Sequence, residues 1–262
     1  MNVHLIAACG VGMASLAGML KEKGCRVTGS DANVYPPMST QLESLGIRLT
    51  SPYAAENIPP DADLVVVGNA VSRGNPEAEE AARRGVPTLS MPQAVARFFI
   101  GERESIVVAG THGKTTATSL AAWSLFDLGA DPSFLVGGVP KNFPVSYRLG
   151  QGRHFVIEGD EYDTAYFDKG PKFLHYRPRI VLLTSVEFDH ADIYRDLDHV
   201  LESFRKLAAI LPPGGLLVAC ADYPDVVAVA REARCPVIFY ATRDGALSGE
   251  QERTAWAVRG TG

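Results

Sequence analysis

The chain alternates short apolar runs with segments in which apolar residues recur at helical spacing. In the first hundred residues, runs of apolar and β-branched residues predict strands over 3–8, 26–30, 61–68 and 86–89. Helical spacing predicts a helix over 13–23, closed by Gly24, and another over 76–84, opened by Pro76 with acids in its first turns. This β-α-β order predicts a parallel sheet wrapped by helices.

A second series of the same kind follows a break at 99–104, where charge and glycine interrupt the periodicity. It predicts strands over 105–109, 155–158, 180–185, 215–220 and 236–240 and helices over 114–128 and 197–211. We therefore expect an α/β protein: a Rossmann-like parallel-sheet domain over 1–99 and a P-loop-type central α/β domain over 105–262. The segment 242–262 shows no closing element, so we expect the second domain to be incomplete at its C-terminal end.

Composition narrows the class of function. The 262 residues carry a formal net charge of −5, which gives no general attraction to nucleic acid or to an anionic membrane. No apolar stretch approaches the roughly 20 residues that cross a bilayer, and the N-terminus lacks the basic leader of a signal peptide. The four cysteines are scattered, without a Cys-x-x-Cys pair, as in proteins of a reducing cytoplasm. We expect a cytoplasmic protein without nucleic-acid or membrane partners.

A glycine-rich motif lies between the strand at 105–109 and the helix at 114–128. Its residues are Gly110, Thr111, His112, Gly113, Lys114, Thr115 and Thr116. Glycines let main-chain N–H groups turn toward phosphate oxygens, the lysine supplies a positive charge, and Thr115 offers a hydroxyl to Mg²⁺. The first glycine lies three residues before Gly113 instead of the usual five, but the strand–loop–helix context favours a nucleoside triphosphate site over an ordinary turn.

Two acidic segments follow later strands. Glu158, Asp160 and Glu161 belong to the segment 158–163, and Glu187 and His190 to the segment 187–192. Ligands of open parallel sheets bind beyond the carboxyl ends of strands, so both segments should meet the glycine-rich loop. Carboxylate oxygens suit Mg²⁺, and an imidazole can fill one position beside waters. Which of the three acids in the first segment binds metal directly stays open; a solvated acidic loop is the alternative.

A second glycine turn follows the first strand. Gly10, Val11, Gly12 and Met13 begin it, Ser15 takes the place of a third glycine, and Asp31 ends the next strand about twenty residues later. This spacing is similar to the dinucleotide fingerprint, in which a main-chain turn approaches a pyrophosphate. NAD is therefore one candidate ligand of this half of the chain.

In order along the chain, the motif at 110–116 and the acidic segments at 158–163 and 187–192 resemble those of the ATP-dependent Mur ligases of bacterial peptidoglycan synthesis. Within that family, the segments Glu-Gly-Asp-Glu-Tyr-Asp, Phe-Asp-Lys, Lys-Phe-Leu-His-Tyr and Glu-Phe-Asp-His-Ala-Asp-Ile resemble the murein peptide ligase subgroup. That subgroup joins UDP-N-acetylmuramate to the tripeptide L-alanyl-γ-D-glutamyl-meso-diaminopimelate in peptidoglycan recycling, and so serves cell-wall biogenesis, cell shape and division. Family members have a third, C-terminal domain, which we expect this chain to lack; alone it should then be inactive.

The resemblance implies ATP and Mg²⁺ as cofactors and an acyl phosphate intermediate, which the peptide amine converts to an amide. It implies that Lys114, Glu158 and His190 are catalytic, and that Thr115, Glu158 and His190 bind metal. The turn at 10–13 should then seat the UDP pyrophosphate rather than NAD, with Asp31 near the ribose or uracil. Further candidate substrate residues are Ser72, Asn75 and Asn142.

Three alternatives stay open. The amino substrate can be L-alanine, as in the related UDP-N-acetylmuramate–L-alanine ligases. The chain can instead be a P-loop switch, although the turn at 10–13 argues against a single nucleotide site. It can also be a fragment that binds nucleotides without catalysis.

Overall fold

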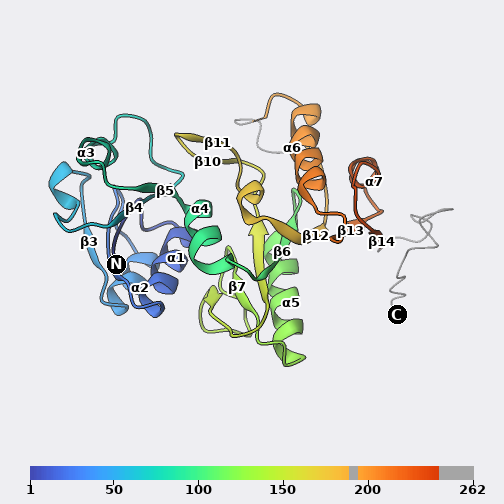
Figure 1. The fold of residues 1–262 in the computed structure, drawn as a ribbon, viewed down its shortest axis with the longest axis horizontal. Helices are drawn as coiled ribbons and strands as arrows, with labels where there is room; N and C mark the ends of the chain where they lie inside the picture. Colours follow the sequence, from blue (N-terminus) through green and yellow to red (C-terminus); the bar gives the residue numbers. More distant parts are fainter. Residues whose placement is uncertain (189–193, 242–262) are drawn as a thin grey trace. The chain divides into compact units, whose positions relative to one another are not determined.

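The computed structural model describes residues 1–188 and 194–241, which form two compact units (Figure 1). The first unit holds Met1–Gly101 together with 135–149 and 163–169, and the second holds Glu102–Phe134, 150–162 and the chain from Gly170 onward. Helices cover parallel sheets in both units, so the predicted α/β class is confirmed. In the described ranges no helix is long and apolar enough to cross a membrane.

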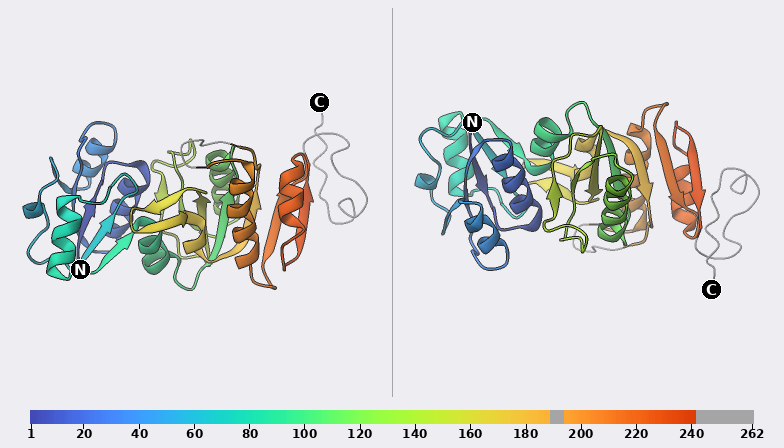
Figure 2. Two further views of the ribbon diagram at one scale, coloured as in Figure 1. Left: turned by 90° about the horizontal axis from the view of Figure 1, so that it is seen from above. Right: turned by 90° about the horizontal axis from the view of Figure 1, so that it is seen from below.

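The first unit is built on five parallel strands in the order β3-β2-β1-β4-β5. Its elements are β1 (Asn2–Ile6), α1 (Val11–Glu22), β2 (Arg26–Ser30), α2 (Met38–Ser44), β3 (Arg48–Thr50), the 3-10 helix η1 (Ala55–Asn57), β4 (Leu64–Val67), α3 (Pro76–Arg84), β5 (Thr88–Ser90), α4 (Met91–Val95) and the π-helical turn η2 (Ala96–Ile100). Seen from above, α3 lies in front of the sheet, and seen from below α1 and α2 do, so they cover opposite faces (Figure 2).

Local chemistry sets the ends of α3 where the sequence predicts them. The Asn75 side chain accepts hydrogen bonds from the main-chain N–H groups of Glu77 and Ala78, and Pro76 occupies the first turn. Gly85 ends the helix at φ 68°, a conformation that favours glycine. Helix α1 differs, because Gly10 begins it without a side-chain cap.

A buried polar network lies under α3. His4 Nε2 is 3.3 Å from Glu77 Oε2, and both side chains are almost completely buried. Ser30 and Asn57 also donate hydrogen bonds to the Glu77 carboxylate. Burial raises the pKa of Glu77, but the hydrogen bonds from His4, Ser30 and Asn57 outweigh it, so the net pKa is lowered. The network ties β1, β2 and η1 to α3.

The second unit carries the sheet β14-β13-β12-β6-β9-β7, with the short strand β8 next to β7. Its elements are β6 (Glu104–Ala109), α5 (Lys114–Asp127), β7 (Ser133–Leu135), β9 (His154–Gly159), the 3-10 helix η3 (Lys172–Tyr176), β12 (Pro178–Leu183), α6 (Leu197–Ile210), β13 (Leu216–Cys220), α7 (Pro224–Ala230) and β14 (Val237–Tyr240). The residues of β8 (Tyr147–Arg148) and β10 (Asp163–Ala165) are counted with the first unit, and β11 (Asp168–Pro171) spans the boundary. Helix α5 packs against β6 and β9, and α6 packs against η3 and α7.

The register of three adjacent strands aligns their carboxyl ends. Ala109, the last residue of β6, lies opposite Leu183 of β12 on one side and Gly159 of β9 on the other. All three strands are parallel, so the segments that follow them start at the same edge of the sheet. This edge carries the glycine-rich loop and the first acidic segment.

The Glu77 network gives a prediction on stability. We expect Glu77→Ala to lower the free energy of unfolding by about 3 kcal/mol or more, because it leaves His4 and its polar neighbours buried without their acceptor. Urea unfolding measures the effect. Glu80→Ala on the same helix is the control, since Glu80 pairs with the exposed Arg83 and its loss should change stability little. An equal loss in both variants would contradict the assignment.

The same carboxylate should make stability depend on pH. Its pKa is lower in the folded chain than the unfolded value of 4.5, so its contribution is complete above that value and is lost as the pH falls through the folded pKa. We therefore expect the difference in unfolding free energy between the wild type and Glu77→Gln to shrink below about pH 4.5. A difference that stays constant or grows on acidification would show that the carboxylate is not stabilised as an anion.

Candidate nucleotide and metal site

The loop from β6 to α5 has a backbone that requires glycine. Gly110 has φ 137°, and a Cβ atom there would lie 2.2 Å from Thr184 Oγ1 and 2.8 Å from the main-chain nitrogen of Ser185. Gly113 has φ 80°, but a Cβ atom there would meet nothing within 4 Å. Gly110 therefore allows the loop to pack closely on the residues that follow β12, whereas Gly113 allows the left-handed backbone of the turn into α5.

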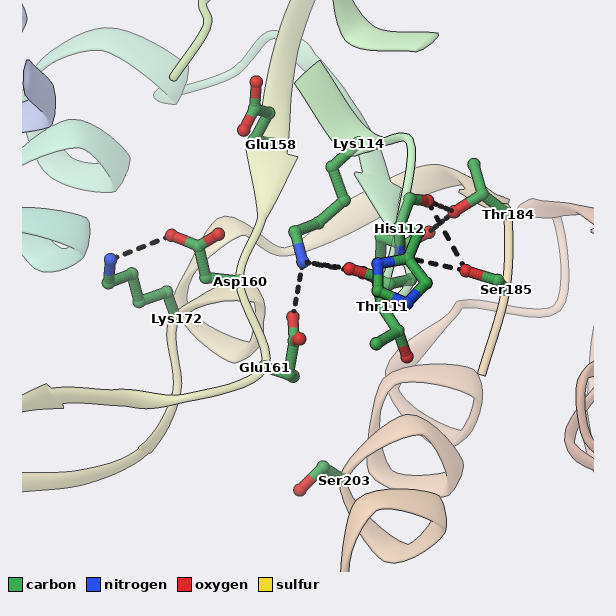
Figure 3. Close-up of polar contacts among 12 residues, drawn as sticks. Thr111, His112, Lys114, Glu158, Asp160, Glu161, Lys172, Thr184, Ser185 and Ser203 are labelled. Carbon is green, nitrogen blue, oxygen red and sulfur yellow. Dashed lines mark hydrogen bonds and ion pairs between the residues drawn. The ribbon is translucent and has the colours of Figure 1, made fainter. Parts of the chain in front are cut away.

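Two hydroxyl residues at the end of β12 hold this loop (Figure 3). Thr184 Oγ1 donates to the carbonyl of His112 at 2.7 Å, and Ser185 Oγ accepts from the main-chain N–H of His112 at 2.9 Å. The Ser185 carbonyl accepts from the N–H of Thr111 at 2.9 Å. The sequence predicts a strand up to residue 185, but β12 ends at Leu183 because the following two residues bond the loop instead.

Thr184 and Ser185 are not among the residues predicted for the site. The signal that points to them is their position, since a pair of hydroxyl side chains directly follows a buried strand next to β6. Their role is to shape the loop through hydrogen bonds with its main chain.

The first turn of α5 is suited to an anion. The helix starts at Lys114, no side chain caps it, and its first turn contains no acidic residue. Its N–H groups and its dipole are therefore available to a negatively charged ligand. Lys114 Nζ lies back over the loop, 2.7 Å from the Gly110 carbonyl and 2.9 Å from Glu161 Oε2 (Figure 3).

The three acids at the end of β9 and directly after it have different partners. Glu158 Oε2 accepts a hydrogen bond from Thr115 Oγ1 at 3.3 Å. Asp160 pairs with Lys172 at 2.8 Å, and Glu161 pairs with Lys114. The structure therefore places one carboxylate beside the threonine hydroxyl and binds the other two to lysines.

Asp160 is partly buried and lies beside Tyr162 and Lys172. Burial first, and then the Asp160 carboxylate, raise the pKa of the Tyr162 hydroxyl, which stays protonated. Lys172 Nζ lies 4.2 Å above the centre of the Tyr162 ring as well as beside Asp160. Asp160, Tyr162 and Lys172 therefore form a polar cluster next to the loop.

The second acidic segment is described only in part. Glu187 contacts the loop, since its N–H donates to Thr111 Oγ1 at 2.9 Å and its carboxylate lies 3.6 Å from His112 Nε2. The predicted ligand His190 lies outside the described residues. Residues 1–188 and 194–241 contain no group of three His, Cys, Asp or Glu side chains able to hold a metal. Mg²⁺ usually keeps several water or phosphate oxygens among its ligands, so two oxygen donors such as Thr115 and Glu158 suit it.

The glycine turn of the first unit is held by Asp31. Its two carboxylate oxygens accept hydrogen bonds from the N–H groups of Cys9, at 2.8 Å, and Asn33, at 3.0 Å. Burial first and then Asp31 raise the pKa of the Cys9 thiol to about 11, so the thiol adds no negative charge. Helix α1 starts at Val11 without a side-chain cap or an acid in its first turn, and a Cβ atom on Gly10 would meet nothing within 4 Å. This turn also fits an anion.

The remaining predicted substrate residues have different environments. Ser72 and Asn142 are exposed, and Asn142 belongs to the segment 135–149 of the first unit. Asn75 is buried and its side chain caps α3. Ser15 bonds Ser146 Oγ at 2.7 Å and fixes the segment 135–149 on α1.

Comparison with known proteins shows the family of the chain. The model of the Mur ligase family, catalytic domain, matches residues 2–103, and that of the Mur ligase middle domain matches 108–259. The chain belongs to the Mur ligase family.

Two relatives are named UDP-N-acetylmuramate–L-alanyl-gamma-D-glutamyl-meso-2,6-diaminoheptandioate ligase. The one from Escherichia coli is 48% identical over 83% of this chain and 48% of its own length, and the one from Haemophilus influenzae is 43% identical over 84% and 49%. The chain thus spans about half the length of these relatives. A crystal structure of a ligase of this name, MPL from Neisseria meningitidis, superposes with a TM-score of 0.86 at 42% identity, covering 91% of this chain and 77% of that one.

The packing of Gly110 gives a prediction. We expect Gly110→Ala to lower the free energy of unfolding by roughly 2 kcal/mol or more, because the new methyl group combines backbone strain with overlap on Thr184 and Ser185. Gly113→Ala is the matched control and should cost about 1 kcal/mol, since it meets only backbone strain. Urea denaturation measures both. The same cost for the two variants would show that the loop does not pack on β12 as described.

Proposed function

We propose that this chain supplies the nucleotide-binding and UDP-sugar-binding parts of an ATP-dependent ligase. The ligase joins UDP-N-acetylmuramate to L-alanyl-γ-D-glutamyl-meso-diaminopimelate and serves peptidoglycan recycling. The observation that carries the proposal is the placement of Thr115 Oγ1 3.3 Å from Glu158, directly after the lysine that opens α5. The identity of 48% to the Escherichia coli enzyme supports the choice of substrates. Because the proposed ligase uses ATP, we propose that it acts in the cytoplasm.

The residues fit a reaction between two anions. The lactyl carboxylate of UDP-N-acetylmuramate attacks the γ-phosphorus of ATP and releases ADP, and the peptide amine then displaces phosphate from the acyl phosphate. Such a reaction depends on positive charge and oriented donors more than on a strong base. Lys114 and the first N–H groups of α5 bind the phosphates, and the turn at 110–113 orients them.

Mg²⁺ fits the donors next to this loop. Thr115 Oγ1 and Glu158 Oε2 are hard oxygen ligands on one side of the loop, and His190 is the proposed ligand of a second ion. Bound there, Mg²⁺ would lower the negative charge of the triphosphate. Asp160 and Glu161 are weaker candidates for metal binding, because each is paired with a lysine.

In the first unit, the turn at 10–13 and the start of α1 bind the UDP pyrophosphate. The uncapped helix start and the open space at Gly10 support this role. Asp31 holds the turn through the N–H group of Cys9, and the ribose or uracil is proposed to lie near Asp31, directly after β2. Ser72 and Asn142 are exposed and are proposed to contact the sugar nucleotide; Asn75 positions α3.

One assay tests the reaction and its amino substrate. The full-length product of the gene is incubated with UDP-N-acetylmuramate, ATP and Mg²⁺ and is offered the tripeptide or L-alanine. We expect the mass of the tripeptide adduct, together with one ADP per product. The L-alanine adduct alone would assign the related L-alanine ligase activity. ATP turnover that needs neither substrate would identify a P-loop switch instead.

Lys114→Ala should lower the formation of ADP in this assay about a hundredfold or more, because the phosphates lose the charge that offsets their own. Lys169→Ala removes an exposed lysine that pairs with Asp163 and should leave the rate unchanged. ADP formation at the wild-type rate in Lys114→Ala would contradict the role of the loop.

For the first unit, we expect calorimetry to show binding of UDP-N-acetylmuramate and no binding of NAD⁺. Gly10→Val should weaken this binding about tenfold without changing the unfolding midpoint, since its side chain enters open space in front of the helix start instead of the core. Binding of NAD⁺ in place of the UDP sugar would assign this unit to dinucleotides.

A further inference from the structure

The ammonium group of Lys114 is surrounded by acceptors of the protein. Its Nζ atom lies 2.7 Å from the carbonyl of Gly110, 2.9 Å from Glu161 Oε2 and 3.4 Å from the carbonyl of Thr111. An ammonium has three N–H donors, so these contacts use all of them. A phosphate that binds Nζ must take over one contact, and the longest, to Thr111, is the weakest.

The main chain and the burial of Glu161 keep this residue beside the lysine. Only 2% of its side chain is exposed, and the buried Tyr194 hydroxyl donates a hydrogen bond to its main-chain carbonyl. The fold therefore holds the main chain of Glu161 independently of Lys114 and keeps its buried side chain next to the lysine. A carboxylate and an ammonium buried at 2.9 Å attract strongly, because little water screens them.

We propose that Glu161 is the permanent counterion of Lys114, a positioning residue that keeps the ammonium at the loop and weakens nucleotide binding. The inference rests on the proposed function in taking the ligand to be a nucleotide. Phosphates that contact Nζ come close to the Glu161 carboxylate, and the two negative charges repel each other. In this role Glu161 is not a metal ligand, in contrast to Glu158, which lies beside Thr115.

The substitution Glu161→Gln tests the electrostatic part. Glutamine has nearly the same size and keeps an oxygen acceptor for Nζ, but it removes the charge. We measure the Kd of ADP for the purified chain by calorimetry, once in EDTA and once with Mg²⁺. The variant should bind ADP about tenfold tighter in both conditions, and Mg²⁺ should change its affinity by the same factor as in the wild type.

Two variants serve as matched controls. Asp163→Asn removes an exposed carboxylate, 2.7 Å from the exposed Lys169, and should leave ADP binding unchanged. Glu158→Gln should reduce the effect of Mg²⁺ on ADP binding. Weaker or unchanged binding in Glu161→Gln would overturn the proposal. A loss confined to the samples with Mg²⁺ would also overturn it and would make Glu161 a metal ligand.

A measurement without nucleotide separates this inference from the proposed function. In a double-mutant cycle, Glu161→Met should raise the unfolding equilibrium constant far more in the wild type than in the Lys114→Met background, because only in the wild type does it leave a buried ammonium unpaired. We expect a coupling of at least tenfold in the unfolding equilibrium constant. Additive effects would overturn the role of Glu161 as counterion. Absence of ADP binding in the wild type would refute the proposed function. The double-mutant cycle would then still test whether Glu161 pairs with Lys114. If Glu161→Gln fails to fold, the same double-mutant cycle still tests the pairing of Glu161 with Lys114.

Discussion

The site depends on the register of three parallel strands. Ala109 lies between Leu183 and Gly159, so the segments that follow β6, β12 and β9 leave the sheet at the same level. The loop at 110–113 can therefore rest on Thr184 and Ser185 while Lys114 reaches the segment after β9. A shift of one residue in this pairing would turn every side chain of the strand to the opposite face and separate these groups.

The second constraint is the distribution of charge beyond these strand ends. Three carboxylates within four residues would repel one another, but two of them pair with lysines from α5 and η3. The remaining one, Glu158, lies beside a threonine hydroxyl. The fold thus places Lys114, which can bind phosphate, and Glu158, which can bind metal, at different positions around the loop. The proposed reaction between two anions depends on positive charge at the phosphates, which Lys114 can supply.

Sequence patterns predict the long elements better than the contacts between them. Strand β2 and helix α3 have the expected bounds, because caps such as Asn75 act within a few residues. The short elements α2, β3 and α4 are missed, since they are too short for a clear period. The bonds of Thr184 and Ser185 to the loop link residues more than 70 positions apart, and no local pattern encodes them. The motif at 110–116 was visible, but the pairing of Glu161 with Lys114 required the structure.

We propose that Lys114, Thr115 and Glu158 form one phosphate and metal site. A crystal structure of the chain with Mg²⁺ and a non-hydrolysable ATP analogue tests this arrangement. We expect the phosphates at the start of α5 in contact with Lys114 Nζ, and the metal bound by Thr115 Oγ1 and Glu158. A metal held by Asp160 or Glu161, or a triphosphate bound away from the loop at 110–113, would contradict it.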